Sequence, residues 1–277
     1  MSTLLRGAPV AERLTLDLSR RSAALRHRGV IPTLAILRVG SSPGDLAYEK
    51  SAAARCARCG IEVRRLFWDS AAPLAEAIRA VNADPSIHGC LLLRPLADRA
   101  AEAAAGQLLL PDKDVDGMTP GSLAGLLTGQ SGFAPCTAQA CLELLDYYEV
   151  PLAGRRAVVV GRSLVVGQPA ALLLQRRNAT VTVCHTGTRD IPALCREADV
   201  LIAAAGRPGL ITVDCLRPGQ TVLDVGVHPG PDGTLCGDVA AEAAALDVAL
   251  TPVPGGVGSV TSAVLCKHTV QAAEKTL

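Results

Sequence analysis

Two glycine-containing segments in the second half of the chain have residue types that suit ligand binding. In VVVGRSLVVGQP (158–169), an apolar run ends at Gly161 and a predicted helix follows. Such a turn lets the backbone approach a diphosphate, and the free N–H groups of the helix N-terminus favour its charge. Because the spacing is not GxGxxG, a plain strand-to-helix turn stays an alternative. In TPVPGGVG (251–258), Gly255 and Gly256 either leave the backbone open to a flat ligand or simply form a loop.

The strand after the first glycine turn indicates which dinucleotide would bind. A site for NAD usually has an Asp or Glu about 20 residues further on, which accepts a hydrogen bond from the ribose 2′-hydroxyl. Here that strand ends at Cys184-His185-Thr186 without an acidic residue, while Arg162 lies in the turn itself. A guanidinium beside a hydroxyl suits a 2′-phosphate. We therefore expect NADP as the cofactor, with a solvated surface arginine as the alternative interpretation of Arg162.

Two side chains in the first half of the chain are suited to hold a heterocycle. Aromatic residues make up only 2% of the sequence, so Tyr48 is a rare flat face for stacking, unless it only fills a core. Asp116 lies in the segment PDKDVDG (111–117), directly before its last residue, Gly117. A carboxylate in a pocket accepts hydrogen bonds from an amino group and a ring N–H, although an Asp-Gly pair is also common in turns.

Alternating strands and helices are expected to position these residues. Apolar runs predict strands, and amphipathic stretches between them predict helices. The expected strands are 32–38, 61–67, 87–93, 157–160, 179–184, 200–205, 221–227 and 247–250, and the expected helices are 47–59, 74–82, 137–147, 169–176, 191–198 and 262–275. This alternation is typical of βαβ units with a parallel sheet.

The expected fold class is α/β, with two α/β domains and a cleft between them. Residues 1–136 are expected to form one domain and residues 137–257 a Rossmann-like domain with a parallel sheet. A C-terminal helix at about 258–277 needs a partner for its apolar face, so we expect it to pack back on the first domain. Clefts between domains are common ligand sites.

Composition excludes several other classes of protein. The 277 residues carry a net charge of +1 with no basic stripe, which argues against a nucleic-acid partner. No apolar run is long enough to span a bilayer and the start lacks a signal-peptide pattern, so we expect a cytoplasmic protein with no membrane partner. The ten cysteines are expected to be reduced and mostly buried. The pair Cys56-Ala-Arg-Cys59 lacks a second ligand pair, so no metal site is expected.

Several segments together resemble the methylenetetrahydrofolate dehydrogenase/methenyltetrahydrofolate cyclohydrolase family. The resemblance runs in order from about Leu34 to the C-terminus. It rests on PDKDVDG (111–117), PCT (135–137), GRS (161–163) with VG (166–167) and Pro169, GDV (237–239) and TPVPGGVG (251–258). The resemblance implies NADP-dependent oxidation of 5,10-methylenetetrahydrofolate to 5,10-methenyltetrahydrofolate in one-carbon metabolism, and a homodimer.

The resemblance also implies roles for individual residues. Tyr48, which would stack on the folate ring, and Asp116, which would hydrogen-bond the pterin, match the catalytic positions. The substrate-binding positions match Tyr48, Leu93, Asp116, Pro254, Gly255 and Gly256. The cofactor-binding positions match Gly161, Arg162, Ser163, Thr186 and Val227.

The sequence departs from the family pattern at two positions of one reaction. The family's Tyr is followed four residues later by a Lys, and here that position is Ala52; the family's Val-Gln-Leu-Pro is here LLRP (92–95), with Leu93 at the Gln position. A third departure is SVT (259–261) in place of Pro-Met-Thr. In the family, the Lys supported by the Gln is held to drive the cyclohydrolase step, and Ala52 moves no proton.

We therefore expect dehydrogenase activity to be retained and cyclohydrolase activity to be weak or absent. One alternative is a fully bifunctional enzyme in which Lys50 or Arg94 substitutes for the missing base, although position 50 of a helix points roughly 200° away from position 48. A second alternative is a non-catalytic NADP- or folate-binding module. A third is a dehydrogenase of another small substrate.

Overall fold

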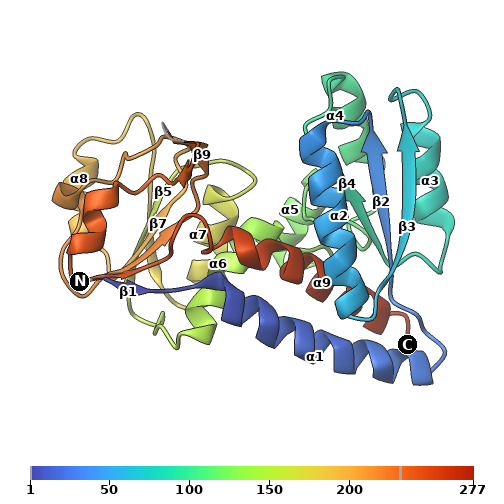
Figure 1. Ribbon diagram of the computed structural model, residues 1–277, viewed down its shortest axis with the longest axis horizontal. Coiled ribbons are helices and arrows are strands. Elements are labelled where there is room, and N and C mark those ends of the chain that lie inside the picture. Colours follow the sequence, from blue (N-terminus) through green and yellow to red (C-terminus); the bar gives the residue numbers. More distant parts are fainter. Residues whose placement is uncertain (1, 231–232) are drawn as a thin grey trace. The chain divides into compact units, whose positions relative to one another are not determined.

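The computed structural model describes residues 2–230 and 233–277, which form two compact units (Figure 1). We call residues 12–136 with 262–277 the N-terminal unit, and residues 137–261 with the chain start up to Ala11 the C-terminal unit. The start of the chain was expected in the first domain. It belongs to the C-terminal unit because strand β1 (Thr3–Leu4) pairs in parallel with β11 (Ala249–Leu250), far away in the sequence.

The N-terminal unit is built on a three-stranded parallel sheet in the order β3-β2-β4 (Figure 1). The strands are β2 (Thr33–Val39), β3 (Glu62–Trp68) and β4 (Gly89–Leu92). The central strand β2 is buried along most of its length, which explains the apolar run LAIL (34–37) within it. Helices α3 (Leu74–Ala83) and α4 (Arg99–Leu108) pack on one face and contribute to a core with β2 and β4.

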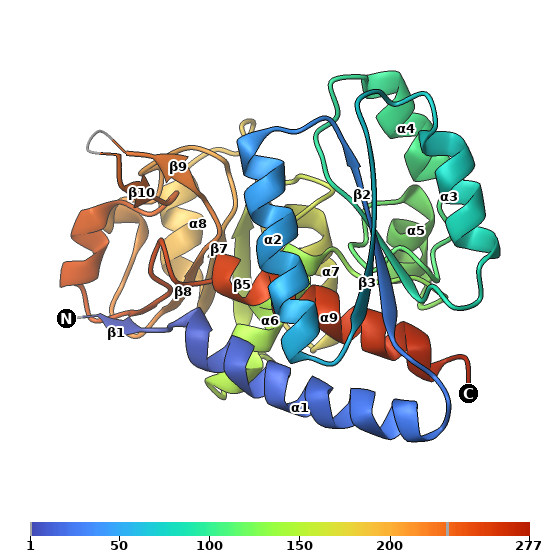
Figure 2. The same cartoon turned by 45° about the vertical axis from the view of Figure 1, so that its right-hand side comes forward.

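Helices α2 (Pro43–Arg58) and α9 (Gly258–Glu274) lie on the other side of this sheet (Figure 2), and α5 (Pro120–Thr128) completes the unit. Helix α2 begins four residues before the expected position 47. Ser42 caps it by accepting a hydrogen bond from the Asp45 N–H at 3.1 Å, and Pro43 occupies the first helical position, where a missing N–H costs nothing. The earlier start places Tyr48 in the second turn of α2.

Helix α1 (Gly7–His27) was not expected from the sequence. Its buried positions in the N-terminal unit recur at helical spacing, but two of them are Thr15 and Ser22, which interrupt the apolar pattern of Leu18 and Leu25. The helix is tied to α9 by Arg21, whose Nε and Nη2 donate to the Glu274 carboxylate at 2.9 and 2.7 Å. Because polar residues occupy buried positions of α1, the apolar pattern did not predict this long helix.

The C-terminal unit is built on a six-stranded, fully parallel sheet in the order β1-β11-β8-β7-β5-β6. Its longer strands are β5 (Arg156–Val160), β6 (Thr180–Cys184), β7 (Val200–Ala203) and β8 (Thr221–Asp224), joined through α7 (Gly167–Arg176) and α8 (Ile191–Glu197). Helix α6 (Cys136–Tyr147) precedes β5. The expected α/β class and parallel sheet are confirmed.

The strand order of the C-terminal unit contains a switch point at β5. The chain leaves β5 for β6 on one side and then returns to β7 on the other side. At such a point the loops after neighbouring strands diverge, and ligands of open α/β sheets bind in the resulting crevice at the carboxyl ends of the strands. In the described part of the chain, no helix is both long and apolar enough to cross a membrane.

The packing of α1 can be tested by truncating one side chain. Leu18 is fully buried, whereas Leu16 on the same helix is 55% exposed. We expect Leu18→Ala to lower the free energy of unfolding by about 2–5 kcal/mol, because it leaves a cavity in a packed core. Leu16→Ala, the matched control, should cost less than about 0.5 kcal/mol. Urea denaturation measures both, and equal losses for the two variants would contradict the described orientation of α1.

Candidate active site

Three pockets together contain all the predicted catalytic, substrate-binding and cofactor-binding residues. The turn pocket lies at the carboxyl ends of β5, β6 and β7, the loop pocket surrounds residues 252–258, and the tyrosine pocket lies around Tyr48 in the N-terminal unit. Their volumes of about 330, 360 and 360 Å³ fall in the range of small-molecule sites.

The glycine turn after β5 forms the floor of the turn pocket. Gly161 has φ +132°, and a side chain there would overlap the carbonyl of Ala204 at the end of β7. A side chain at Gly167, the first residue of α7, would likewise overlap the Gly161 carbonyl. The Ser163 hydroxyl accepts hydrogen bonds from the N–H groups of Val166 and Gly167 at 3.1 and 3.3 Å. The turn therefore requires glycine at both positions, and Ser163 holds it closed.

The turn pocket is positively charged. Arg162, Ser163 and Thr186 line it, together with Arg207 from the loop after β7, and none of its lining residues is acidic. Arg207 was missed in the sequence because nothing in its local pattern indicates that the end of β7 neighbours the end of β5. His185 also lines the pocket, and its Nδ1 accepts a hydrogen bond from the Gly187 N–H at 3.1 Å, so it supports the loop after β6.

Two buried carboxylates hold the loops that follow β7 and β8. Asp238 accepts hydrogen bonds from the N–H groups of Ala205, Gly206 and Arg207 at 2.6 to 2.9 Å, and its Oδ1 lies 2.8 Å from His228 Nε2. We call Asp238 and its partner Asp224 the carboxylate clasp.

Asp224 completes the clasp from the end of β8. It accepts hydrogen bonds from the N–H groups of Gly226, Asp238 and Val239 at 2.9 to 3.0 Å. Burial raises the pKa of Asp224 to about 6, against the effect of these backbone donors. Gly237 lies directly against the Asp224 carboxylate, where no side chain would fit. The segment GDV (237–239) thus has a structural role that its sequence alone does not reveal.

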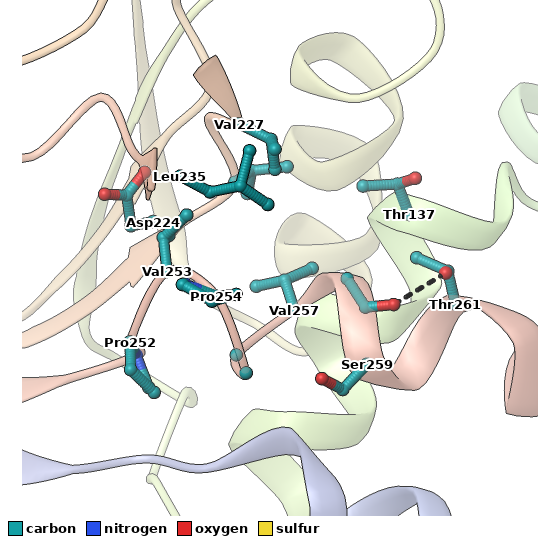
Figure 3. Close-up of a pocket in the computed structure, with 14 residues that line it drawn as sticks. Thr137, Asp224, Val227, Leu235, Pro252, Val253, Pro254, Val257, Ser259 and Thr261 are labelled. Carbon is teal, nitrogen blue, oxygen red and sulfur yellow. Dashed lines mark hydrogen bonds between the residues drawn. The ribbon is translucent and has the colours of Figure 1, made fainter. Parts of the chain in front are cut away.

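The loop pocket is mostly apolar (Figure 3). The side chains of Val227 and Leu235 lie beside each other there, close to Val253 and Pro254. Val227 is thus in the same pocket as Pro254, Gly255 and Gly256, whereas the other four predicted cofactor residues line the turn pocket.

Backbone contacts fix the glycines of this loop. Gly255 has φ +105°, and its carbonyl accepts a hydrogen bond from the Gly7 N–H at 2.8 Å. A side chain at Gly256 would come within 2.5 Å of the Pro252 carbonyl oxygen. Further along, the Thr261 hydroxyl donates to the Gly258 carbonyl at 3.0 Å in the first turn of α9 (Figure 3). The two glycines are therefore required by the close packing of the loop and by its left-handed turn.

The tyrosine pocket brings Tyr48, Leu93 and Asp116 together. Leu93 follows β4, and Arg94 beside it also lines the pocket. Tyr48 is 39% exposed, which leaves part of its ring open to a ligand. Burial and the nearby charge of Asp116 raise the pKa of the Tyr48 phenol, so this phenol stays protonated.

A largely buried ion pair fixes the part of α2 that carries Tyr48. The Glu49 carboxylate accepts a hydrogen bond from Arg38 Nε of β2 at 2.8 Å. Ala52, one turn after Tyr48, is only 1% exposed and contributes nothing polar. Lys50 lies on the exposed side of α2 and does not line the pocket.

Asp116 is paired with an arginine inside the tyrosine pocket. Arg94 Nη2 donates to Asp116 Oδ2 at 3.4 Å. Burial raises the pKa of the Asp116 carboxyl, and the charge of Arg94 opposes that rise. From the sequence, Arg94 was considered as a substitute for the absent Lys, and its contact with Asp116 was not foreseen.

The cysteines form no disulfide and no metal site in the described part of the chain. Cys56 of α2 and Cys59, the residue directly after this helix, are fully buried, and Cys56 Sγ lies 3.8 Å from Cys266 Sγ of α9. These thiols pack α2 against α9.

Comparison with known proteins agrees with both halves of the chain. Residues 5–116 match the catalytic domain of tetrahydrofolate dehydrogenase/cyclohydrolase, and residues 135–277 match its NAD(P)-binding domain. The bifunctional protein FolD of Carboxydothermus hydrogenoformans is 46% identical over 281 residues, which cover 99% of this chain and 98% of that protein.

Solved structures give the same result. The bifunctional FolD methylenetetrahydrofolate dehydrogenase/cyclohydrolase from Campylobacter jejuni superposes with a TM-score of 0.93 at 37% identity and covers 100% of both chains. The Trypanosoma brucei FolD enzyme, solved with NADP and an inhibitor, superposes with a TM-score of 0.90 at 31% identity and covers 99% of this chain and 98% of that one. With both domains matched in order and close relatives aligned from end to end, the chain belongs to the tetrahydrofolate dehydrogenase/cyclohydrolase family.

Proposed function

We propose that this enzyme oxidises 5,10-methylenetetrahydrofolate to 5,10-methenyltetrahydrofolate with NADP, and that its cyclohydrolase activity is weak or absent. One observation carries the proposal. The tyrosine pocket keeps a tyrosine and a carboxylate for binding a pterin, but Ala52 is buried and Leu93 is apolar where the family pattern has Lys and Gln. We further propose the cytoplasmic location and the homodimer that the family pattern implies.

The dehydrogenase step needs no protein base. The C–H bond of the methylene carbon breaks, and the hydride with both electrons passes to the nicotinamide ring of NADP. The nitrogen lone pairs of the substrate stabilise the cation that is left, so no proton is transferred. The protein has to hold and align two flat molecules, which by itself contributes several kcal/mol. The loss of a proton-transferring Lys therefore leaves this step intact.

The turn pocket fits NADP. Gly161 and Gly167 bring the backbone close to a diphosphate, and Ser163 and Thr186 supply hydroxyls. The 2′-phosphate would be bound by Arg162, with Arg207 adding positive charge, and no carboxylate lines the pocket to accept from the 2′-hydroxyl of NAD. Val227, in the loop pocket, is proposed as a further cofactor contact.

The folate would bind through Tyr48 and Asp116. The exposed part of the Tyr48 ring offers a stacking face, and Asp116 accepts hydrogen bonds from the amino group and ring N–H of the pterin. Leu93 adds apolar contact in the same pocket. Pro254, Gly255 and Gly256 of the loop pocket are proposed as further substrate-binding residues, since their backbone is open to a flat ligand.

The cyclohydrolase step is different, because water must add to the methenyl carbon and protons must move. Among the residues that line the tyrosine pocket, Tyr48 has a raised pKa and a guanidinium such as that of Arg94 is a poor base. The two carboxylates of the pocket are already engaged, Asp45 with the Ser42 hydroxyl and Asp116 with Arg94, so we assign neither as the base. Lys50 does not line the pocket. A fully bifunctional enzyme is the second candidate, favoured by relatives that are named bifunctional.

Both activities should be assayed on one preparation of the purified protein. We expect NADPH to form from 5,10-methylenetetrahydrofolate and NADP. We also expect the ratio of the cyclohydrolase rate to the dehydrogenase rate to be lower than in a relative that has the Lys, by a factor on the order of 10²–10⁴. A normal ratio of the two activities would support the bifunctional candidate. No folate-dependent NADPH formation would rule out the dehydrogenase.

Restoring the two missing residues tests the role of the tyrosine pocket. We expect Ala52→Lys with Leu93→Gln to increase methenyl hydrolysis by about 10-fold or more, because it returns a proton-transferring group to the pocket. Ala54→Lys, at an exposed position of the same helix, is the matched control and should give no increase. If the double variant binds folate as the unchanged enzyme does but gains no hydrolysis, the explanation through positions 52 and 93 is wrong.

The cofactor preference is tested at Arg162. Arg162→Ala should raise the KM for NADP by about 10- to 100-fold, because a charge-assisted contact with the 2′-phosphate is lost. The KM for NAD should change little. Arg155→Ala, at the opposite end of β5, is the control and should affect neither cofactor. Steady-state kinetics with both cofactors would refute the assignment if Arg162→Ala weakened NAD and NADP equally.

A further inference from the structure

Arg94 has unused hydrogen-bond donors inside the tyrosine pocket. Its side chain is 24% exposed, and its Nε is buried without a hydrogen-bond partner. Within the described residues, only one of the five N–H groups that a guanidinium carries makes a hydrogen bond, the long contact of 3.4 Å to Asp116. An unsatisfied buried donor is unfavourable, so a guanidinium in this state is better suited to a ligand-bound pocket than to an empty one.

The position of Arg94 is restrained from two sides. Its Nη2 faces Asp116, and its Nη1 lies 3.9 Å from the carboxylate of Glu102. Glu102 is itself held, because it accepts a hydrogen bond from the Leu96 N–H at 2.7 Å and pairs with Arg99 at 3.4 Å. The guanidinium therefore lies between two anchored carboxylates, and it does not rely on solvent to balance its charge.

We propose that Arg94 is a specificity-determining residue that donates to the exocyclic oxygen on C4 of an oxo-pteridine, while Asp116 accepts from N3–H and from the amino group on C2. The inference rests on the proposed function, since it takes the ligand of the tyrosine pocket to be a folate. It concerns a residue of this chain at a position where the family pattern has leucine.

The order of hydrogen-bonding groups on the ligand supports this assignment. A 2-amino-4-oxopteridine presents, along one edge, an oxygen acceptor at C4, an N–H donor at N3 and an amino donor at C2. The Arg94–Asp116 pair presents the complementary order, with donors on the guanidinium followed by acceptors on the carboxylate. Burial raises the pKa of Asp116, and the charge of Arg94 opposes that rise, so the pair favours the ionised carboxylate more than an isolated Asp116 would.

A 4-amino-pteridine would fit this pair poorly. Its group at C4 is a donor that faces the donors of Arg94, and its N3 carries no hydrogen for Asp116. A site built to hydrogen-bond one group discriminates strongly against an analogue that leaves its buried polar atoms unpaired. The amino group at C2, which Asp116 would bind, is common to both compounds. The compounds differ at C4, which faces Arg94, and at N3, which faces Asp116, so variants of Arg94 are needed to isolate its contribution.

The test measures the dissociation constants of tetrahydrofolate and of its 4-amino counterpart, tetrahydroaminopterin, by calorimetry. We expect the unchanged enzyme to bind the 4-oxo compound more tightly. Arg94→Leu should weaken the 4-oxo compound by about 10- to 100-fold, as for a lost hydrogen bond to a charged group, and change the 4-amino compound by less than about 3-fold. Arg94→Lys, which keeps the charge but loses the planar fork, should keep part of the preference.

Two further variants serve as controls. Arg99→Leu removes the other arginine that contacts Glu102, but Arg99 is 73% exposed and does not line the pocket, so both affinities should stay unchanged. Asp116→Asn should weaken both compounds, because both present the amino group at C2. If Arg94 acted only by positioning Asp116, Arg94→Leu would weaken the binding of both compounds, as Asp116→Asn does.

The outcomes separate the inference from the proposed function. If Arg94→Leu weakens both compounds equally, or leaves both unchanged, the specificity role of Arg94 is wrong while folate binding stands. If the unchanged enzyme binds neither compound, the folate site itself is wrong and the inference falls with it.

Discussion

The carboxylate clasp is the constraint on which the C-terminal unit depends. Burying two carboxylates is unfavourable unless each is surrounded by hydrogen-bond donors. Here six backbone N–H groups donate to the carboxylates of Asp224 and Asp238, and the ring of His228 lies against Asp238. One of the six is the N–H of Asp238, which donates to Asp224 and so joins the two residues. The loops after β7 and β8 are therefore fixed as one piece. Because the first loop lines the turn pocket and the second lines the loop pocket, one network shapes both.

Much of the fold could be predicted from the sequence, because apolar runs and their spacing report local structure. The strands around β2 and β5 were found in this way. Helix α1 was missed because Thr15 and Ser22 occupy buried positions, and β1 was missed because its two residues become a strand only by pairing with β11. Both failures concern contacts between segments far apart in the chain, which local patterns do not contain.

The same limit applies to the pockets. Gly161, Arg162 and Asp116 lie in motifs, so their residue types and neighbours were informative. Arg207 and Asp224 lie outside these motifs, and they enter only because β7 lies between β5 and β8. Which strands are neighbours is a property of the folded sheet, and the sequence alone predicts only that the sheet is parallel.

Under the proposed function, the tyrosine pocket would hold a ligand without moving its protons. Ala52 and Leu93 occupy the positions where the family pattern has Lys and Gln, but the pocket still contains a positive charge, because Arg94 lies beside Asp116. A guanidinium keeps its charge at every physiological pH, so it orients and selects without titrating. Compared with the family pattern, the proposed pocket therefore has an arginine that selects the ligand by its hydrogen-bonding groups in place of a lysine that transfers protons.

The loop pocket also joins segments that are synthesised far apart in time. The N–H of Gly7 donates to the Gly255 carbonyl, and the N–H of Leu5 donates to the Leu250 carbonyl. On the ribosome, β1 lacks its partner strand until β11 has emerged, about 250 residues later. At a synthesis rate of roughly 5–20 residues per second, that strand stays unpaired for on the order of ten seconds or more, and an unfinished chain has no loop pocket with which to capture a ligand.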